Sequence, residues 1–63
     1  MAQKLKVTLK RSLIGQHKKR RRTAHALGLR RIGQTRLHPD NPSIRGMIRV
    51  IEDLIEVEAV EEG

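Results

Sequence analysis

A dense run of basic residues is the best candidate for a functional site in this 63-residue sequence. Residues 12–31 read SLIGQHKKRRRTAHALGLRR and contain seven lysines and arginines but no acid. Five of these cations are consecutive, from Lys18 to Arg22, and His17 and His25 can join them at lower pH. Such side chains bind phosphates through charge-assisted hydrogen bonds. The run therefore predicts a surface that binds a polyanion.

Charge is unevenly distributed along the rest of the chain. The net charge is +7, yet residues 1–49 hold all 14 lysines and arginines with Asp40 as their only acid. Residues 50–63 hold six acids and no base. This asymmetry indicates contact with nucleic acid or with a membrane surface. A solvated helix face, a nuclear-import signal or a lipid-binding patch stay open as alternatives. Nucleic acid is favoured over simple solvation because like charges four residues apart destabilise a free helix.

Several kinds of chemistry are missing from the sequence. It has no Phe, Tyr or Trp, so base stacking on aromatic side chains is excluded, and binding should go through phosphates, sugars and shape. Without Cys, and with scattered histidines, it has no recognisable metal motif. No catalytic constellation or phosphate-binding Gly-rich loop is evident, so we expect no enzyme, no cofactor and no small-molecule substrate. No run of 18 apolar residues or signal-peptide pattern occurs, which predicts a cytoplasmic protein without membrane contact.

The elements that must position the basic run follow from periodicity. Alternation predicts a strand over Lys4–Arg11, with Leu5, Val7 and Leu9 inward. Residues 12–16 are expected to form a loop, in which Gly15 is free to take a positive φ or to let another backbone come close. A helix is then expected over His17–Leu27, ended by Gly28. Its buried stripe would be Thr23, Ala24 and Leu27, with Leu13 nearby, and Arg20 would extend outward along its stem. A second strand is expected over Gln34–His38, with Thr35 and Leu37 inward and Gln34 and Arg36 outward.

A second helix and a third strand complete the predicted fold. Asn41 and Pro42 predict a helix start as N-cap and first helical residue. Ile44, Met47, Ile48 and Ile51 form its apolar face, and it should end around Asp53. Ile55, Val57 and Ala59 then alternate with glutamates as a strand. We therefore predict an α+β fold in β-α-β-α-β order, a three-stranded antiparallel sheet with two helices on one face. Residues 1–60 would form one domain and 61–63 a flexible acidic tail. Opposite charge makes strands one and three neighbours.

Gly46 lies opposite the apolar stripe of the second helix. Glycine at an exposed helical position costs about 1 kcal/mol relative to alanine. One explanation is that an external backbone lies against the helix there, beside Arg45, Arg49 and the helix N-terminus, forming a second phosphate site over Asn41–Gly46. A tolerated glycine without a role is the alternative.

Three sequence blocks resemble a known family. R-S-L-I-G (Arg11–Gly15), L-G-L-R-R-I-G-Q-T (Leu27–Thr35) and D-N-P-S-I-R-G-M-I (Asp40–Ile48), in this order and spacing, resemble the bacterial large-subunit ribosomal protein conventionally numbered thirty. The resemblance covers Lys4 to about Val57. Asn41 stands where the family usually has Thr. The first helix begins with more consecutive bases than usual, and without the usual Pro.

The resemblance implies the same fold and a structural role on the ribosome, bound to 23S rRNA close to the 5S rRNA and beside other large-subunit proteins. We expect RNA contact at fourteen residues: Arg11, Ser12, Gly15, Lys18, Lys19, Arg21, Arg22, Arg30, Arg31, Asn41, Pro42, Arg45, Gly46 and Arg49. A DNA-binding or nucleoid protein is the main rival, although strands at both ends leave no room for a helix-turn-helix. A membrane-surface module is a second rival, but it would need the apolar face of the second helix to stay exposed.

Overall fold

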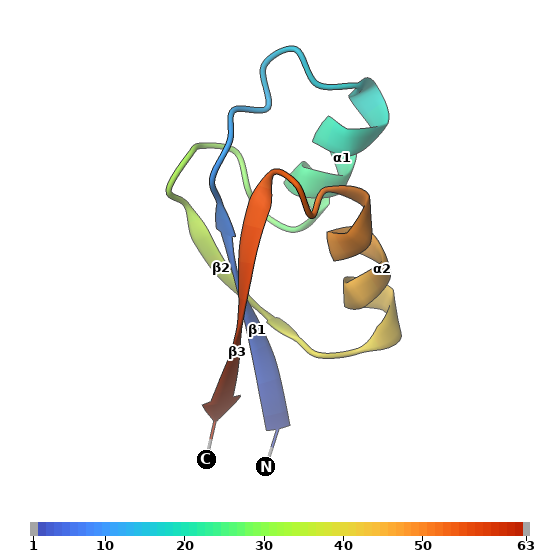
Figure 1. The fold of residues 1–63 in the computed structure, drawn as a ribbon. Helices are drawn as coiled ribbons and strands as arrows, with labels where there is room; N and C mark the ends of the chain where they lie inside the picture. The colour runs from blue at the N-terminus through green and yellow to red at the C-terminus, as the bar shows by residue number, and fades with distance from the viewer. Residues whose placement is uncertain (1, 63) are drawn as a thin grey trace.

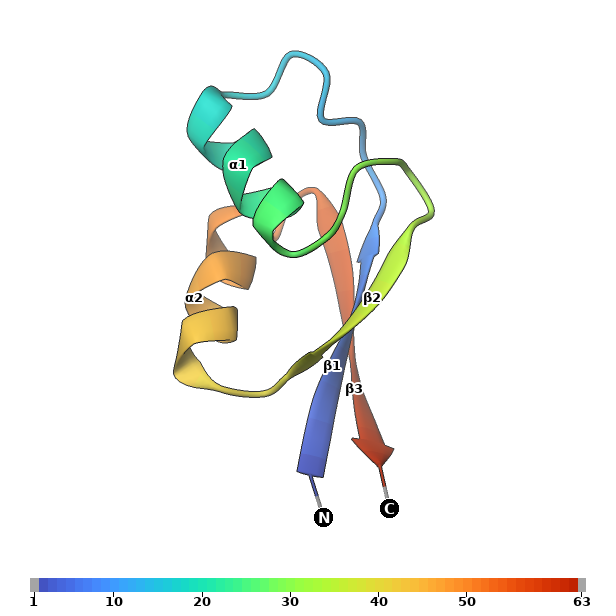
Figure 2. The same cartoon turned by 180° about the vertical axis from the view of Figure 1, so that it is seen from behind.

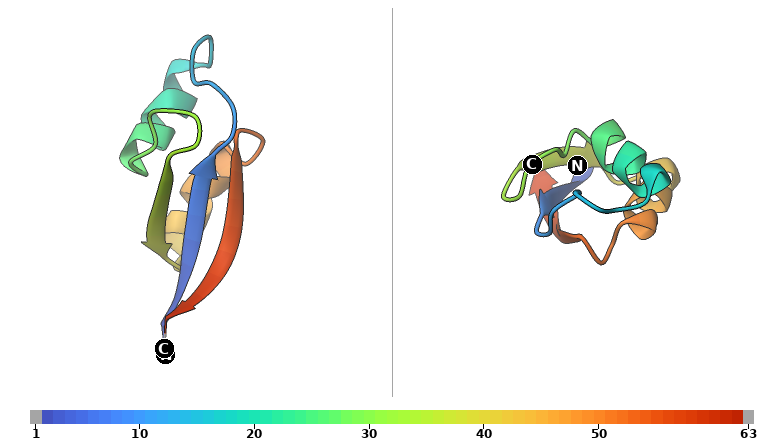
Figure 3. Two further views of the ribbon diagram at one scale, coloured as in Figure 1. Left: turned by 90° about the vertical axis from the view of Figure 1, so that its left-hand side faces the viewer. Right: turned by 90° about the horizontal axis from the view of Figure 1, so that it is seen from above.

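The central strand β1 (Ala2–Leu9) organises a three-stranded antiparallel sheet of order β2-β1-β3. This computed structural model describes residues 2–62. The remaining elements are α1 (Lys18–Ala26), β2 (Thr35–Pro39), α2 (Pro42–Val50) and β3 (Ile55–Glu62). Both helices cover the same face of the sheet, and the other face is open (Figures 1 and 3). The predicted α+β fold, its element order and the β1–β3 pairing are confirmed.

The alternation of polar and apolar residues in β1 places its apolar side chains in the core, on the face of the sheet that the helices cover. Leu5, Val7 and Leu9 are buried under the helices, as predicted. Lys6 lies on the open face directly opposite Glu58 of β3, so the rows of opposite charge are neighbours as expected. The strand ends two residues before the predicted boundary because the N–H groups of Lys10 and Arg11 both donate to the carbonyl of Leu54, at 2.9 and 3.1 Å.

The acidic end of the chain pairs with the start of β1. β3 continues through Glu62, and Glu61 lies opposite Gln3 in the antiparallel register. The part of the predicted tail that the structure describes is therefore strand rather than loop. Gly63 lies outside the described residues, and the flexibility of residues 61–63 stays a prediction.

The predicted orientation of β2 is wrong. In the register of β1 and β2, Leu37 lies opposite Lys6 and Thr35 opposite Thr8, so both side chains are on the open face. Leu37 is 51% exposed, and the Thr35 and Thr8 hydroxyls are 3.0 Å apart. His38 lies on the helix face instead, where its Nε2 is 2.7 Å from the Leu27 carbonyl oxygen. Periodicity assigns the two faces of a strand from hydrophobicity alone. It therefore did not predict that β2 would direct polar side chains toward the helices.

Local capping explains where α1 begins and ends. The Lys19 N–H donates to the His17 imidazole at 3.3 Å, which places His17 at the N-cap. Gly28 has a φ of +83°, and the N–H groups of Gly28 and Leu29 donate back to His25 and Ala24 at 2.9 Å each. This pair of bonds is the Schellman ending that glycine favours. Ala24 and Leu27 are buried, and Thr23 is half-buried, as expected.

The second helix begins as predicted and ends earlier. The Asn41 side chain accepts the Ile44 N–H at 2.8 Å, and Pro42 is the first helical residue. Ile44, Met47, Ile48 and Ile51 pack against the core. The predicted end near Asp53 is wrong, because Ile51 is already the C-cap and the Leu54 N–H donates to the Ile51 carbonyl at 2.8 Å in the turn that follows.

Replacing Asn41 by alanine should lower the free energy of unfolding by about 1 kcal/mol, since the Ile44 N–H then loses its acceptor. Urea unfolding followed by far-UV circular dichroism measures the change. An Asn41→Asp variant keeps a capping oxygen and serves as the control. Equal stability of the alanine variant and the wild type would show that this cap contributes nothing.

Candidate nucleic-acid interface

The outward face of α1 carries the densest exposed charge. Because Ala24 and Leu27 point into the core, the opposite side of the helix presents Lys18, Arg21, Arg22 and His25, which together line a shallow hollow of about 340 Å³. Lys19 is exposed beside them. Among residues 2–62, no acid forms an ion pair with the lysines and arginines of this face, which are Lys18, Lys19, Arg21 and Arg22. Unneutralised cations held on one rigid helix face suit an extended anion.

The loop between β1 and α1 adds a second part of this surface. Arg11 and Ser12 are exposed, and the Ser12 hydroxyl accepts the Ile14 N–H at 3.1 Å. Leu13 turns into the core and is buried. Gly15 has a φ of +83°, the first of the two roles considered for this glycine. The loop therefore has a defined shape, and it leads directly into the N-terminus of α1 (Figure 1).

Arg30 and Arg31 lie in the loop between α1 and β2. Their backbone N–H groups both donate to the Gln34 side-chain oxygen, at 2.7 and 3.2 Å, while the side chains stay exposed. The Gly33 N–H donates to the carbonyl of Leu9, the last residue of β1, at 2.7 Å. Both loops therefore lie at the end of the sheet where β1 stops, beside α1 (Figures 1 and 2).

Arg20 is directed away from this surface. Its guanidinium donates to the Gln16 side chain at 2.8 Å and to the Val50 carbonyl at 3.4 Å, and it forms an ion pair with Asp53. These contacts join α1 to the C-terminal end of α2. The expectation that Arg20 extends outward along its stem from the buried stripe is confirmed, and the contacts explain why one member of the run differs from its neighbours.

The polar and charged groups at the start of α2 already bind one another, which was not expected. Arg45 forms two hydrogen bonds with the Asp40 carboxylate, from Nε at 2.5 Å and from Nη2 at 2.8 Å. The Arg45 hydrogen bond holds the pKa of Asp40 below its usual value, and Asp40 raises that of Arg45. Asn41 already uses the Ile44 N–H. An anion at this helix start would therefore meet an existing carboxylate, and only part of the Arg45 guanidinium is available.

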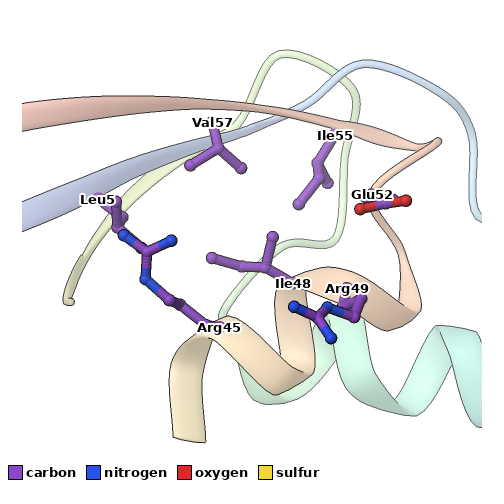
Figure 4. Close-up of a pocket in the computed structure, with 7 residues that line it drawn as sticks. All are labelled: Leu5, Arg45, Ile48, Arg49, Glu52, Ile55 and Val57. Atoms are coloured by element: carbon purple, nitrogen blue, oxygen red, sulfur yellow. The ribbon is translucent and has the colours of Figure 1, made fainter. Parts of the chain in front are cut away.

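A hollow of about 420 Å³ separates α2 from β3 (Figure 4). Arg45, Arg49 and Glu52 extend from α2 and its C-terminal turn into its rim, and apolar side chains from Leu5, Ile48, Ile55 and Val57 line the rest. Gly46 is exposed, and a Cβ built on it would meet nothing within 4 Å. Open space at Gly46 is the geometry that close approach of an external backbone requires.

The predicted residues fall into two separate groups. The start of α2, with Asn41 and Pro42, lies at the far end of the helix layer from the start of α1 (Figures 1 and 2). The molecule measures 39 Å along its longest axis. A single anion can contact both groups only by running along the helix layer, which a polymer can do and a small anion cannot.

Two exposed isoleucines in the basic loops were not among the predicted site residues. Ile14 and Ile32 each directly precede a glycine of positive φ, Gly15 and Gly33. The repeated Ile-Gly pair is a sequence signal that could have identified them, because a residue beside a tight glycine turn is poorly placed to reach a core.

Other kinds of site find little support in the part of the chain that the structure describes. No group of three His, Cys, Asp or Glu side chains lies close enough to hold a metal ion within residues 2–62. No helix among these residues has the length and hydropathy needed to span a bilayer.

Comparison with known proteins agrees with this picture. The family model for ribosomal protein L30p/L7e matches residues 5–55. The protein from Geobacillus kaustophilus named large ribosomal subunit protein uL30 is 50% identical over 62 residues, covering 98% of this chain and 100% of the relative. Proteins of the same name from Rubrobacter xylanophilus and Finegoldia magna are 53% identical over 58 residues and 54% identical over 57 residues. These alignments cover 92% and 90% of this chain, and 95% of each relative. The family is structural, in line with the prediction of a non-enzymatic protein, and the chain belongs to the ribosomal protein L30p/L7e family.

Proposed function

We propose that this protein is a structural constituent of the large ribosomal subunit that binds 23S rRNA through phosphate and shape contacts. The observation that carries the proposal is the outward face of α1, where exposed cations have no acidic partner among residues 2–62. The names of the relatives agree with a place in the large subunit. RNA phosphates supply the negative charge that this face lacks.

The contacts proposed for the RNA differ in strength. The β1–α1 loop, the outward face of α1 and the α1–β2 loop lie at one end of the molecule and would form the main surface. The start of α2 would form a weaker second contact, because Asp40 already binds Arg45. Duplex RNA is read mainly by shape, ribose hydroxyls and phosphates, which agrees with a surface devoid of aromatic side chains.

The partners follow from the same proposal. The binding site on the ribosome would lie in 23S rRNA close to the 5S rRNA, with other large-subunit proteins beside it. Chemical footprinting of 23S and 5S rRNA in subunits with and without the protein tests this location. Protection confined to 23S rRNA far from the 5S rRNA would contradict it.

Sedimentation in sucrose gradients tests the function itself. A tagged chain expressed in cells should sediment with free large subunits and with whole ribosomes, and it should leave both fractions at high salt. Recovery only at the top of the gradient would overturn the proposal. In vitro, 23S rRNA should compete for the protein better than duplex DNA at equal salt, and the reverse order would favour a DNA-binding protein.

Gly46→Leu should raise stability and weaken RNA binding at the same time. Removing glycine from an exposed helix interior stabilises it by about 0.8 kcal/mol, and nothing within 4 Å obstructs a new Cβ. A bulky side chain would nevertheless keep an RNA backbone away from α2. Urea unfolding and filter binding to 23S rRNA measure the two effects.

Gly46→Ala is the matched control, since it gives a similar stabilisation with a much smaller side chain. The expected order of RNA affinity is wild type, then alanine, then leucine. Unchanged affinity in a folded leucine variant would show that Gly46 is a tolerated glycine with no role in binding.

A further inference from the structure

The basic end of the molecule carries two large apolar side chains in open solvent. Ile14 is 90% exposed and Ile32 is 61% exposed, the two highest values among the large hydrophobic residues that the structure describes. Each lies in a loop beside α1, and each is the residue before a glycine of positive φ. Single exposed apolar residues are common on protein surfaces. A repeated arrangement within one charged surface needs a specific explanation.

Ile14 is held in solvent by its own loop. Its N–H is bonded to the Ser12 hydroxyl at 3.1 Å, and the preceding residue, Leu13, is buried in the core. The Gln16 N–H donates to the Leu13 carbonyl at 3.2 Å, which closes the turn around Ile14 and Gly15. Because Leu13 points inward, its neighbour Ile14 is directed outward.

Ile32 is held outward in an equivalent way. Leu29 is fully buried on one side, and the Gly33 N–H is bonded to the Leu9 carbonyl at 2.7 Å on the other. The Gln34 N–H also donates to the Arg31 carbonyl at 3.1 Å, which closes the turn that contains Ile32. Neither side chain therefore needs a large loop movement to meet a partner, and the entropic cost of ordering these loops on binding is reduced.

Charge around the two side chains identifies the class of partner. Arg11 and Lys18 lie on either side of Ile14 in the chain, and Arg30 and Arg31 directly precede Ile32. No acid occurs between residues 11 and 39. A protein surface complementary to these loops would have to be strongly acidic and apolar at once. RNA offers both features together, since phosphates alternate with riboses and base edges along its grooves.

We propose that Ile14 and Ile32 are RNA-binding residues that pack against riboses or bases between the phosphates held by the neighbouring cations. Branched aliphatic side chains are used as wedges in nucleic-acid grooves by proteins that bind without aromatic stacking. This inference rests on the proposed binding of 23S rRNA. It adds a contact that depends on shape and burial rather than on charge, and so gives the site a preference for RNA that presents an accessible groove or loop there.

Ile14→Thr and Ile32→Thr test the inference. Threonine keeps the branched Cβ and removes apolar surface, and both positions are exposed, so the fold should be unaffected. Partial burial of one isoleucine on RNA predicts a loss of affinity for 23S rRNA of roughly 5- to 30-fold per variant. The slope of log K against log salt should not change, because no phosphate contact is lost.

Leu37→Thr is the matched control. Leu37 is 51% exposed on the open face of the sheet, on a strand where threonine is well tolerated, so this variant should bind as the wild type does.

Isoleucine variants with wild-type affinity for 23S rRNA would overturn the inference while leaving the proposed function intact. Isoleucine variants that bind naked rRNA normally but fail to enter subunits would assign the loops to a protein neighbour, which also overturns it. A changed salt slope would mean that cations had moved, and would rule out a direct apolar contact. Wild-type protein that does not bind 23S rRNA would defeat the proposed function itself.

Discussion

Leu9→Ala should remove a large share of the protein's free energy of unfolding. Leu9 is fully buried at the end of β1, and its backbone holds the α1–β2 loop through bonds to Gly33 and Gln34. Truncating a buried leucine costs about 2–5 kcal/mol. A domain of this size has a total stability of roughly 3–9 kcal/mol, so the loss is a large share of the whole. Far-UV circular dichroism during urea and thermal unfolding measures it.

Leu37→Ala provides the control, because it deletes the same atoms from a half-exposed position on the neighbouring strand. It should cost less than about 1 kcal/mol. Similar losses at the two positions would contradict the division of the sheet into a buried face and an open one. Added 23S rRNA should partly restore the stability of the Leu9 variant, since a ligand that binds the folded state alone stabilises it by mass action.

The strands and helices were predictable where one kind of residue dominates one face. From Lys4 to Leu9, β1 alternates polar and apolar residues, and the stripe from Ile44 to Ile51 at α2 recurs at helical spacing, so the buried faces of both elements were predicted correctly. β2 offered no such signal. Its helix-facing positions include His38, which is accommodated there because Leu27 presents a free carbonyl at the end of α1. That acceptor belongs to another element, and no local pattern in residues 35–39 reveals it.

The candidate site was also predictable only in part, because some of its contacts join elements that are distant in the sequence. The basic run itself was evident from charge, and the outward direction of Lys18, Arg21 and Arg22 followed from helical geometry. The ion pair between Arg20 and Asp53 joins residues 33 positions apart, and it depends on how α1 packs against α2. The Asp40–Arg45 pair depends on the turn before α2. Partners set by tertiary packing cannot be derived from spacing.

Several acids of this protein lie beside cations that are not on the outward face of α1. Asp53 binds Arg20, Glu56 lies 3.1 Å from Lys10, and Glu58 is opposite Lys6 on the open face. Within the part of the chain that the structure describes, Arg45 at the start of α2 is the one predicted RNA contact that forms an ion pair with an acid. The folded structure thus concentrates unpaired positive charge on α1 and its two flanking loops, although the sequence has six acids near its C-terminus. Repulsion within that concentration is relieved when RNA binds, which couples binding to stability.

Replacing Arg21 and Arg22 together by glutamine should therefore weaken RNA binding strongly without harming the fold. If each side chain neutralises one phosphate, the slope of log K against log salt falls by about 1.4–1.8 for the pair. At about 0.1 M salt this corresponds to a loss of roughly 25- to 60-fold relative to the wild type. Stability should stay the same or rise slightly, because Lys18 and Arg22 repel each other one turn apart on the helix. Filter binding to 23S rRNA over a salt series, with urea unfolding, measures both quantities.

A double replacement of Lys4 and Lys6 by glutamine separates a local effect from a general one. It lowers the net charge from +7 to +5, as the arginine pair does, but both residues lie on the open face of β1, away from α1. A general attraction between a basic protein and RNA predicts equal losses for the two variants. A phosphate-binding surface on α1 predicts a large loss for the arginine pair alone. Equal losses would therefore refute the assignment of Arg21 and Arg22 as specific contacts, because both double replacements lower the net charge by the same amount and differ in where on the molecule they do so.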